Sequence, residues 1–371
     1  MRRSVLTVLL PLLLGASGDL LAQARTAGRP SQGHYWGLDL LARQEWTKQR
    51  FGDLPDVNRW LLRARPRVEF GNSTFTGGLG GDFLYGSEDN TKVADNIDID
   101  LTTIADNYRS RSARLDLAFL GIKPSQLVEV KGGLFEMPLP LTEMLWDRDL
   151  RAQGGAAKLE FRARDGGSAL SASALYTQGS HVFSDKGTSM TGFMAAAMFQ
   201  TGLTAFLQMN AGYLQYRGLE DLDPRLHRQN AIVDGKYAHE YRVADGQLHL
   251  RNEGSMPLEV YGDYCWNTAV TEQNRGLWIG VILGDLSVSR ARAEYTYAQI
   301  DSDATLGAYN TDDFLWSTGF EAHRGEISVT SGKDSTLAFI GQIQRPKDVD
   351  NEEMAKHWVR RYRIELRFRS F

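Results

Sequence analysis

Few of the residues that could carry covalent chemistry are arranged for it in this sequence. Ser180 and His181 are neighbours, but adjacent side chains on a strand point to opposite faces and cannot form a nucleophile–base pair. The seven histidines are scattered, and Cys265 is the single cysteine. No G-x-S-x-G, P-loop or H-E-x-x-H motif occurs. The sequence therefore predicts no enzyme, no catalytic residues and no cofactor.

Carboxylates gather in the segment 88–100, where Asp95, Asp98 and Asp100 could contribute oxygen ligands to a calcium ion. The alternative is a solvated acidic loop, which is the more common role of such a run. We favour the acidic loop and predict no metal site.

The most informative charged residues are arginines that alternate with apolar residues. Arg63, Arg65 and Arg67 share one face of the segment 60–70, whereas apolar side chains occupy the other face. A wall of arginines lowers the energy of anions in a confined aqueous path; alternatively, the arginines pair with acids across strands. The residues predicted to line such a path are Arg63, Arg65, Arg67, Arg114, Arg162, Arg164, Arg290, Arg292, Arg363 and Arg367.

The same alternation continues to the last residues of the chain and predicts about sixteen strands. They lie near 35–46, 59–71, 74–86, 111–121, 126–136, 155–165, 168–179, 190–200, 203–217, 241–252, 257–268, 275–285, 289–300, 316–332, 335–346 and 357–371. Short connections alternate with long ones, which is typical of outer-membrane barrels with short periplasmic turns and long extracellular loops. The sequence thus predicts an all-β fold, a transmembrane antiparallel β-barrel, with fourteen or eighteen strands as the neighbouring possibilities.

Strand parity also separates the two faces of the barrel. The outward set is apolar and is expected to include Leu115, Leu117 and Phe119 on one strand and Tyr362, Ile364, Leu366 and Phe368 on the last. Lipid-facing and lumen-facing residues alternate in such barrels, so the charged complementary set should face the lumen.

The N-terminus has the pattern of an export signal. Arg2 and Arg3 precede an apolar run from 5 to 14, and Ala22-Gln23-Ala24 forms a small-x-small cleavage site. The apolar run is shorter than the roughly 20 residues that a membrane-spanning helix needs. We predict a signal peptide at 1–24 and one barrel domain at 25–371, located in the outer membrane of a Gram-negative (diderm) bacterium.

The connection that follows the fifth predicted strand mixes apolar and charged residues without a strand period. A solvent-facing loop has little reason to carry several buried-type side chains, so we predict that 139–149 folds into the barrel as a constriction loop. The alternative is an external loop that caps the rim or contacts a neighbouring subunit. Residues expected to act at the constriction are Trp146, Asp147, Arg148, Asp149 and Arg151.

The chain ends in Phe371, which fits the terminal aromatic signal read by the barrel assembly machinery. However, Phe371 has the opposite parity to the apolar face of the last strand, so either a bulge near Arg369-Ser370 shifts the register or the parity fails there. Deleting Phe371 should impair assembly, which the yield of folded barrel in membranes would measure. Normal assembly of the truncated chain would remove this assignment.

Several segments resemble one known family. The run Gly133-Leu-Phe-Glu-Met-Pro138 followed by Leu145-Trp-Asp-Arg-Asp-Leu150 resembles the bacterial porin family of general and polyphosphate-type porins. The later segments 257–267, 276–284 and 293–304 resemble the same family, so the likeness covers most of the mature chain. It implies a sixteen-stranded diffusion channel, a homotrimer, and no enzymatic residues.

The predicted function is passive diffusion of small hydrophilic solutes or ions, with a preference for anions. The alternative is a substrate-specific outer-membrane transporter, for example for hydrophobic compounds, which would favour a plug and an apolar path. Expected partners are outer-membrane lipid, the barrel assembly machinery, two further copies of the chain and the solutes, but no nucleic acid.

Overall fold

The computed structural model describes the strands that surround the lumen and most of the residues that connect them. The described residues are 33–48, 56–87, 111–163, 167–180, 187–222, 229–311, 313–332, 334–347 and 355–370. The predicted signal peptide, the acidic run 88–100, Arg164 and Phe371 lie outside them.

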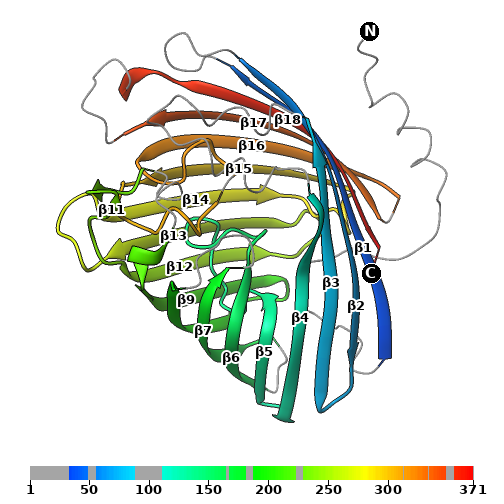
Figure 1. Cartoon of the computed structure of the whole chain (residues 1–371). Coiled ribbons are helices and arrows are strands. Elements are labelled where there is room, and N and C mark those ends of the chain that lie inside the picture. Colours follow the sequence, from blue (N-terminus) through cyan, green and yellow to red (C-terminus); the bar gives the residue numbers. More distant parts are fainter. Residues whose placement is uncertain are drawn as a thin grey trace.

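The described strands form a closed barrel in which each strand pairs with its neighbours in antiparallel fashion (Figure 1). Sixteen strands take part in the order β1-β18-β17-β16-β15-β14-β13-β12-β9-β8-β7-β6-β5-β4-β3-β2, and the pairing of β1 with β18 closes the ring. Because a closed barrel leaves no unpaired edge, all backbone polar groups in the wall can be satisfied. The predicted all-β barrel fold is confirmed.

The barrel strands match the predicted segments within a few residues. Their bounds are β1 Gly33–Lys48, β2 Val57–Gly71, β3 Phe75–Gly86, β4 Arg111–Ser125, β5 Val128–Glu136, β6 Arg151–Arg162, β7 Ala169–Ser180, β8 Ser189–Gln200, β9 Ala205–Arg217, β12 Arg242–Asn252, β13 Leu258–Asn267, β14 Arg275–Leu283, β15 Ala291–Ile300, β16 Phe320–Ser331, β17 Ser335–Pro346 and β18 Val359–Ser370. A small hairpin of β10 Ile232–Val233 and β11 Lys236–Tyr237 lies in the connection between β9 and β12, after the short 3-10 helix Leu219–Asp221.

Connections of different length emerge at the two ends of the barrel. The turns 72–74, 126–127, 201–204 and 332–334 are short and join strand ends at one end of the barrel, whereas 137–150, 218–241, 301–319 and 347–358 are long and join strand ends at the other. The start of β1 and the end of β18 lie at the short-turn end. In outer-membrane barrels in general, the short turns lie on the periplasmic side.

The two faces of the wall differ in chemistry as strand parity requires. Large apolar side chains are exposed on the outside, among them Leu79, Leu115, Leu120, Phe161, Leu170, Phe193, Leu250, Ile327 and Phe339. An apolar patch that continues around the barrel is far larger than soluble proteins expose, and it suits a lipid environment. Among the described residues, no helix has the length and apolar character needed to cross a membrane.

Two outward assignments were wrong because β4 contains a β-bulge. The register with β3 shifts between Gly80 and Gly81, so Asp116 is an extra residue on β4. An extra residue reverses the faces of the residues that follow it. Leu115 is therefore exposed outside, whereas Leu117 and Phe119, predicted to face lipid, are buried on the inner side at 2% and 8% exposure.

The last strand behaves more simply than expected. The pairing of β18 with β1 is regular through Arg369 and Ser370, without a bulge. The outward residues of β18 are Tyr362, Ile364, Leu366 and Phe368, as parity predicted. The strand β18 therefore keeps one register with β1 to Ser370.

Candidate functional site: two loops facing an arginine wall

The connection 137–150 lies inside the barrel rather than outside it. Its apolar residues Leu139, Met144, Leu145, Trp146 and Leu150 are at most 3% exposed. These side chains remain buried because they pack on the inner wall and on a second loop, and not on lipid. Burying a single side chain of this size contributes roughly 1.5–3 kcal/mol.

Contacts to several strands hold this first loop in place. The Thr142 hydroxyl donates a hydrogen bond to the Asp263 carboxylate of β13. Met144 lies 3.8 Å from Cys265, sulfur to sulfur, and a Cβ on the nearby Gly276 of β14 would come within 2.7 Å of the Met144 sulfur. A glycine is therefore needed where the loop approaches the wall.

The described residues of a second connection, 301–311 and 313–319, also fold inward, although the sequence predicts a strand from 316 and, between 300 and that strand, one of the long extracellular loops. The structure corrects both points, because β16 begins at Phe320 and Leu306, Tyr309, Phe314 and Trp316 are at most 2% exposed. The signal was available, since these residues are the same mixture of apolar and polar types that marked the first loop.

The base of the second loop is fixed by buried polar residues. The Asn230 amide donates to the carbonyl oxygens of Ser302 and Thr305 at 2.6 and 2.8 Å and accepts from the Gly307 N–H at 2.7 Å. The Tyr241 hydroxyl donates to Asp303 at 2.6 Å. Buried polar groups of this kind rigidify a loop when each partner is satisfied.

The two loops are bonded to each other inside the barrel. The Asp147 N–H donates to the Tyr309 carbonyl oxygen at 2.8 Å, and the Thr311 N–H donates to the Glu143 carbonyl oxygen at 2.9 Å. The rings of Trp146 and Tyr309 stack with centroids 5.5 Å apart and planes 10° apart. The loops therefore form one layer within the lumen, seen as the teal and orange traces inside the strands in Figure 1.

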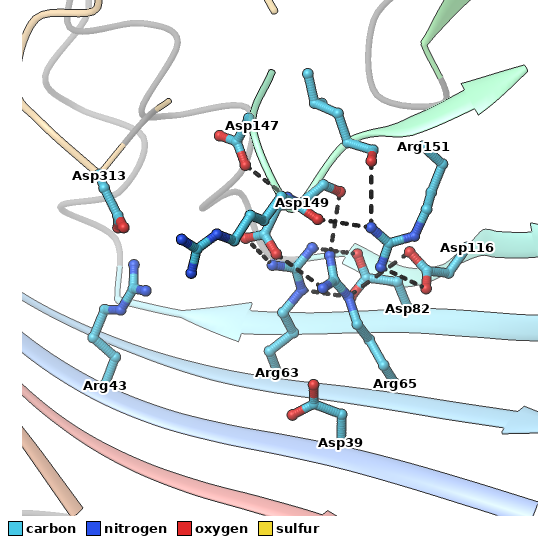
Figure 2. A network of polar contacts seen from close by, with 12 residues as sticks. Asp39, Arg43, Arg63, Arg65, Asp82, Asp116, Asp147, Asp149, Arg151 and Asp313 are labelled. Atoms are coloured by element: carbon cyan, nitrogen blue, oxygen red, sulfur yellow. Dashed lines mark hydrogen bonds and ion pairs between the residues drawn. The ribbon is translucent and has the colours of Figure 1, made fainter. Parts of the chain in front are cut away.

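One acidic edge of this layer faces arginines of β2. Arg63 bonds Asp149 of the loop at 2.5 Å and Asp82 of β3 at 2.9 Å, and Arg65 bonds Asp149 at 2.9 Å. Figure 2 shows Asp149 lying against both guanidinium groups. Arg151, at the start of β6, pairs with Asp116 at 3.2 Å.

A second acidic edge of this layer faces β18. This strand lies across the seam from β2, where the seam is the pairing of β1 with β18 that closes the barrel. Asp313 of the second loop pairs with Arg363 of β18 at 2.5 Å, and Arg363 also pairs with Glu45 of β1 at 2.7 Å. Arg361 donates to the Asp313 carbonyl oxygen at 2.9 Å. In Figure 2 the Arg43 side chain points toward Asp313.

The remaining predicted arginines lie in more than one environment. Arg67 pairs with Glu136 at 3.2 Å, Arg114 with Asp82 at 2.6 Å and Arg292 with Glu294 at 2.5 Å, all on the inner face. The Arg367 guanidinium is bonded to Glu365 of its own strand.

Two predicted residues lie away from the loops. Arg162 is exposed at the short-turn end of β6, where it pairs with Glu160 at 2.5 Å. Arg290 is in the turn before β15, with a left-handed backbone at φ 58° and an exposed side chain.

Several residues of the wall were not among the predicted sites. Arg43 and Glu45 on β1 share the inward parity of Glu365 and Arg363, to which they are bonded, and Arg59 pairs with Glu45 at 2.5 Å. Extending the parity argument to β1 and to the start of β2 would have found them. Their partners could not be read from sequence, because these depend on which strands meet at the seam.

On the inner faces of β1–β4 and β16–β18, arginines outnumber carboxylates among the described side chains. The arginines are Arg43, Arg59, Arg63, Arg65, Arg67, Arg114, Arg324, Arg361, Arg363, Arg367 and Arg369. The carboxylates are Asp39, Glu45, Glu69, Asp82, Asp116, Glu326 and Glu365. The loop carboxylates Asp149 and Asp313 reduce this excess but do not remove it.

The pKa values of the loop carboxylates are shifted in different directions. Burial disfavours the charged form of Asp149, but Arg63 and Arg65 outweigh that effect and hold its pKa well below the usual range. The Asp313 pKa is lowered in the same way by Arg363. In contrast, burial raises the pKa of Glu143 to about 7 despite its ion pair with Arg148 at 2.8 Å.

Solved structures of bacterial porins share this architecture. OprB of Pseudomonas putida, solved at high pH, superposes with a TM-score of 0.60 at 10% identity, over 91% of this chain and 94% of that chain. OmpF of Salmonella typhi, in complex with daunomycin, gives a TM-score of 0.53 at 12% identity, over 92% of this chain and 98% of that chain. No protein-family model matches the sequence, and comparison with curated proteins finds no match.

The closed sixteen-stranded barrel with an apolar exterior and a charged interior is the fold of the bacterial porins. The chain has this fold.

Proposed function

We propose that the protein is a channel for passive diffusion of small hydrophilic solutes or ions, with a preference for anions. The observation that supports it is the excess of arginines on the inner wall opposite the two loops. In a narrow aqueous path such a wall attracts anions and repels cations. Because most arginines are bonded to carboxylates, we expect a moderate preference rather than a strict one.

We assign the constriction to the joined loops 137–150 and 301–319. Asp149 and Asp313 approach arginines on two sides of the lumen, so the free passage runs beside these ion pairs. A cavity of about 260 Å³ lies next to the first loop, and its lining includes Glu143, Arg148 and His249. We propose that solutes cross the constriction through this cavity.

The proposal includes location and assembly, and we propose the outer membrane of a Gram-negative bacterium as the location. A homotrimer, maturation after residue 24 and recognition of Phe371 by the assembly machinery fit a porin, and cross-linking of the mature protein in membranes would test the trimer. The proposal assigns the barrel no enzymatic activity.

A second candidate is a gated, substrate-specific transporter. It is favoured by one observation, namely that ion pairs of 2.5 Å join both loops to the wall. The polar lining argues against hydrophobic compounds as the substrate.

The deciding experiment is the reversal potential of the refolded full-length barrel in a planar bilayer under a salt gradient. Stepwise conductance with an anion-biased potential is expected. A cation-biased potential would retain the channel and reject the role of the arginines. Absence of conductance from verified folded barrels would favour the gated transporter.

Selectivity should also depend on pH through Glu143. As the pH rises through about 7, this buried carboxyl loses its proton and adds a negative charge beside the passage. Anion preference should therefore fall between about pH 5.5 and 8.5. Reversal potentials of the wild type and Glu143→Gln, measured over this range, check the prediction: the variant should lose this part of the pH dependence, and identical profiles would contradict it.

A further inference from the structure

The outer face of the barrel contains a groove that the channel function does not explain. Five outward residues form one row across neighbouring strands, because Tyr295 pairs with Gly325, Gly325 with Gly341, Gly341 with Tyr362, and Tyr362 with Trp46. The two glycines leave a gap between the aromatic residues. The cavity there measures about 620 Å³, and its outward lining also includes Val281, Leu283, Ala293, Ile327, Phe339 and Ile364.

The chain itself does not require glycine at these two positions. Neither residue is among those with positive φ. A Cβ on Gly325 would meet no heavy atom within 4 Å, and one on Gly341 would meet only Tyr362 Cδ1 at 4.0 Å. Glycine inside a strand costs about 0.5–1 kcal/mol relative to alanine. Glycines inside strands often mark a close approach by another molecule, and here the two glycines lie beside each other between aromatic residues.

Basic residues lie on the same face, toward the end with the long connections. Arg360 and Lys48 are directly opposite each other on β18 and β1, one outward position beyond Tyr362 and Trp46. That step is about 7 Å along the strand. Like charges directly opposite destabilise a strand pair. Asp56, 2.6 Å from Lys48, balances one of the two charges, which leaves a net positive charge at this pair.

Aromatic residues near Lys48 and Arg360 mark this level of the barrel as a membrane interface. Arg345 lies over the ring of Trp358 at 4.9 Å, and His323 bonds the Tyr295 hydroxyl at 2.7 Å. Tryptophan and tyrosine gather where a barrel meets the headgroups. The row from Tyr295 to Trp46 therefore borders the headgroup region, and the basic residues lie one step above it. The lower part of the groove, lined by Leu283, Ile327, Phe339 and Ile364 one outward position further from the long connections, lies at acyl-chain depth.

We propose that this surface binds a phosphate-bearing lipid of the outer leaflet. An acyl chain occupies the groove over Gly325 and Gly341, and a phosphate group lies between Lys48 and Arg360. The lining offers apolar contact below and cationic donors above, which is complementary to an anionic amphiphile. The inference rests on the outer-membrane location but not on solute selectivity.

The test uses the purified full-length barrel in detergent and native mass spectrometry, with lipid A and phosphatidylcholine as probes. Gly325→Leu with Gly341→Leu fills the groove, and Lys48→Gln with Arg360→Gln removes the charge. The matched control is Gly246→Leu with Gly262→Leu on β12 and β13, where an added Cβ also meets nothing within 4 Å.

Retention of lipid A over phosphatidylcholine is expected for the wild type and the control, with retention about tenfold weaker in both test variants. Unchanged retention by the charge variant would overturn the assignment, as would equal retention of phosphatidylcholine. If filling the groove dissociates an oligomer and leaves lipid retention intact, the groove is an interface between copies instead. Because the charge variant alters only exposed side chains, it tests the proposal even if the leucine variant fails to fold.

Discussion

Replacing both loop carboxylates, Asp149→Asn with Asp313→Asn, should increase single-channel conductance and strengthen anion preference. These two residues join the loops to Arg63, Arg65 and Arg363. Asparagine keeps the shape but removes the charge, so the arginines gain influence over the passage and the loops lose their strongest links to the wall. Each charged hydrogen bond lost should cost about 1.5–3 kcal/mol of stability.

The measurement is the reversal potential under a salt gradient together with single-channel conductance. Glu160→Gln with Glu129→Gln is the matched control, because it also removes two negative charges paired with basic residues, Lys158 and Arg162 for Glu160 and Lys131 for Glu129, but far from the loops. The loop variant should shift the reversal potential clearly more than the control. An equal shift would mean that total lumen charge, and not the loop edge, sets selectivity.

Trp146→Ala should separate the two loops and destabilise their packing inside the lumen. The indole is 3% exposed and stacks on Tyr309, so its removal leaves a cavity where the loops meet. Large-to-small changes of this type cost about 3–5 kcal/mol. Conductance should rise and become noisier, and deletion of 139–149 should raise it further, by several-fold.

Thermal unfolding and single-channel recording would check this prediction in the same preparation. Trp146→Phe retains a stacked ring and serves as the control, with an expected effect much smaller than that of alanine. Unchanged conductance in both the alanine variant and the deletion would contradict a constriction by this loop.

Strand parity predicted most of the wall but not its exceptions. The alternation of Arg63, Arg65 and Arg67 with apolar residues has a physical cause, since one face meets lipid and the other meets water. The bulge at Asp116 could not be predicted, because an extra residue leaves the local pattern plausible in either register. Leu117 and Phe119 were misplaced for this reason alone.

The inward loops show a different limit. Leu306, Tyr309, Phe314 and Trp316 carried the same information as the apolar residues of the first loop, so the second loop was predictable in principle. The wall residues that this loop contacts were not predictable. The pairing of Asp313 with Arg363 and of Asp149 with Arg63 depends on the path of two loops through the lumen, which no local pattern encodes.

The seam between β1 and β18 has a consequence for biogenesis. Arg363 meets Glu45 across 318 residues, and Arg369 meets Asp39 across 330. Such contacts form only after nearly the whole chain is available, and folding dominated by distant contacts is slow. Until that moment the first and last strands are open edges that invite pairing with other chains. A cell making this barrel must therefore shield an unfinished sheet for most of its synthesis and transit.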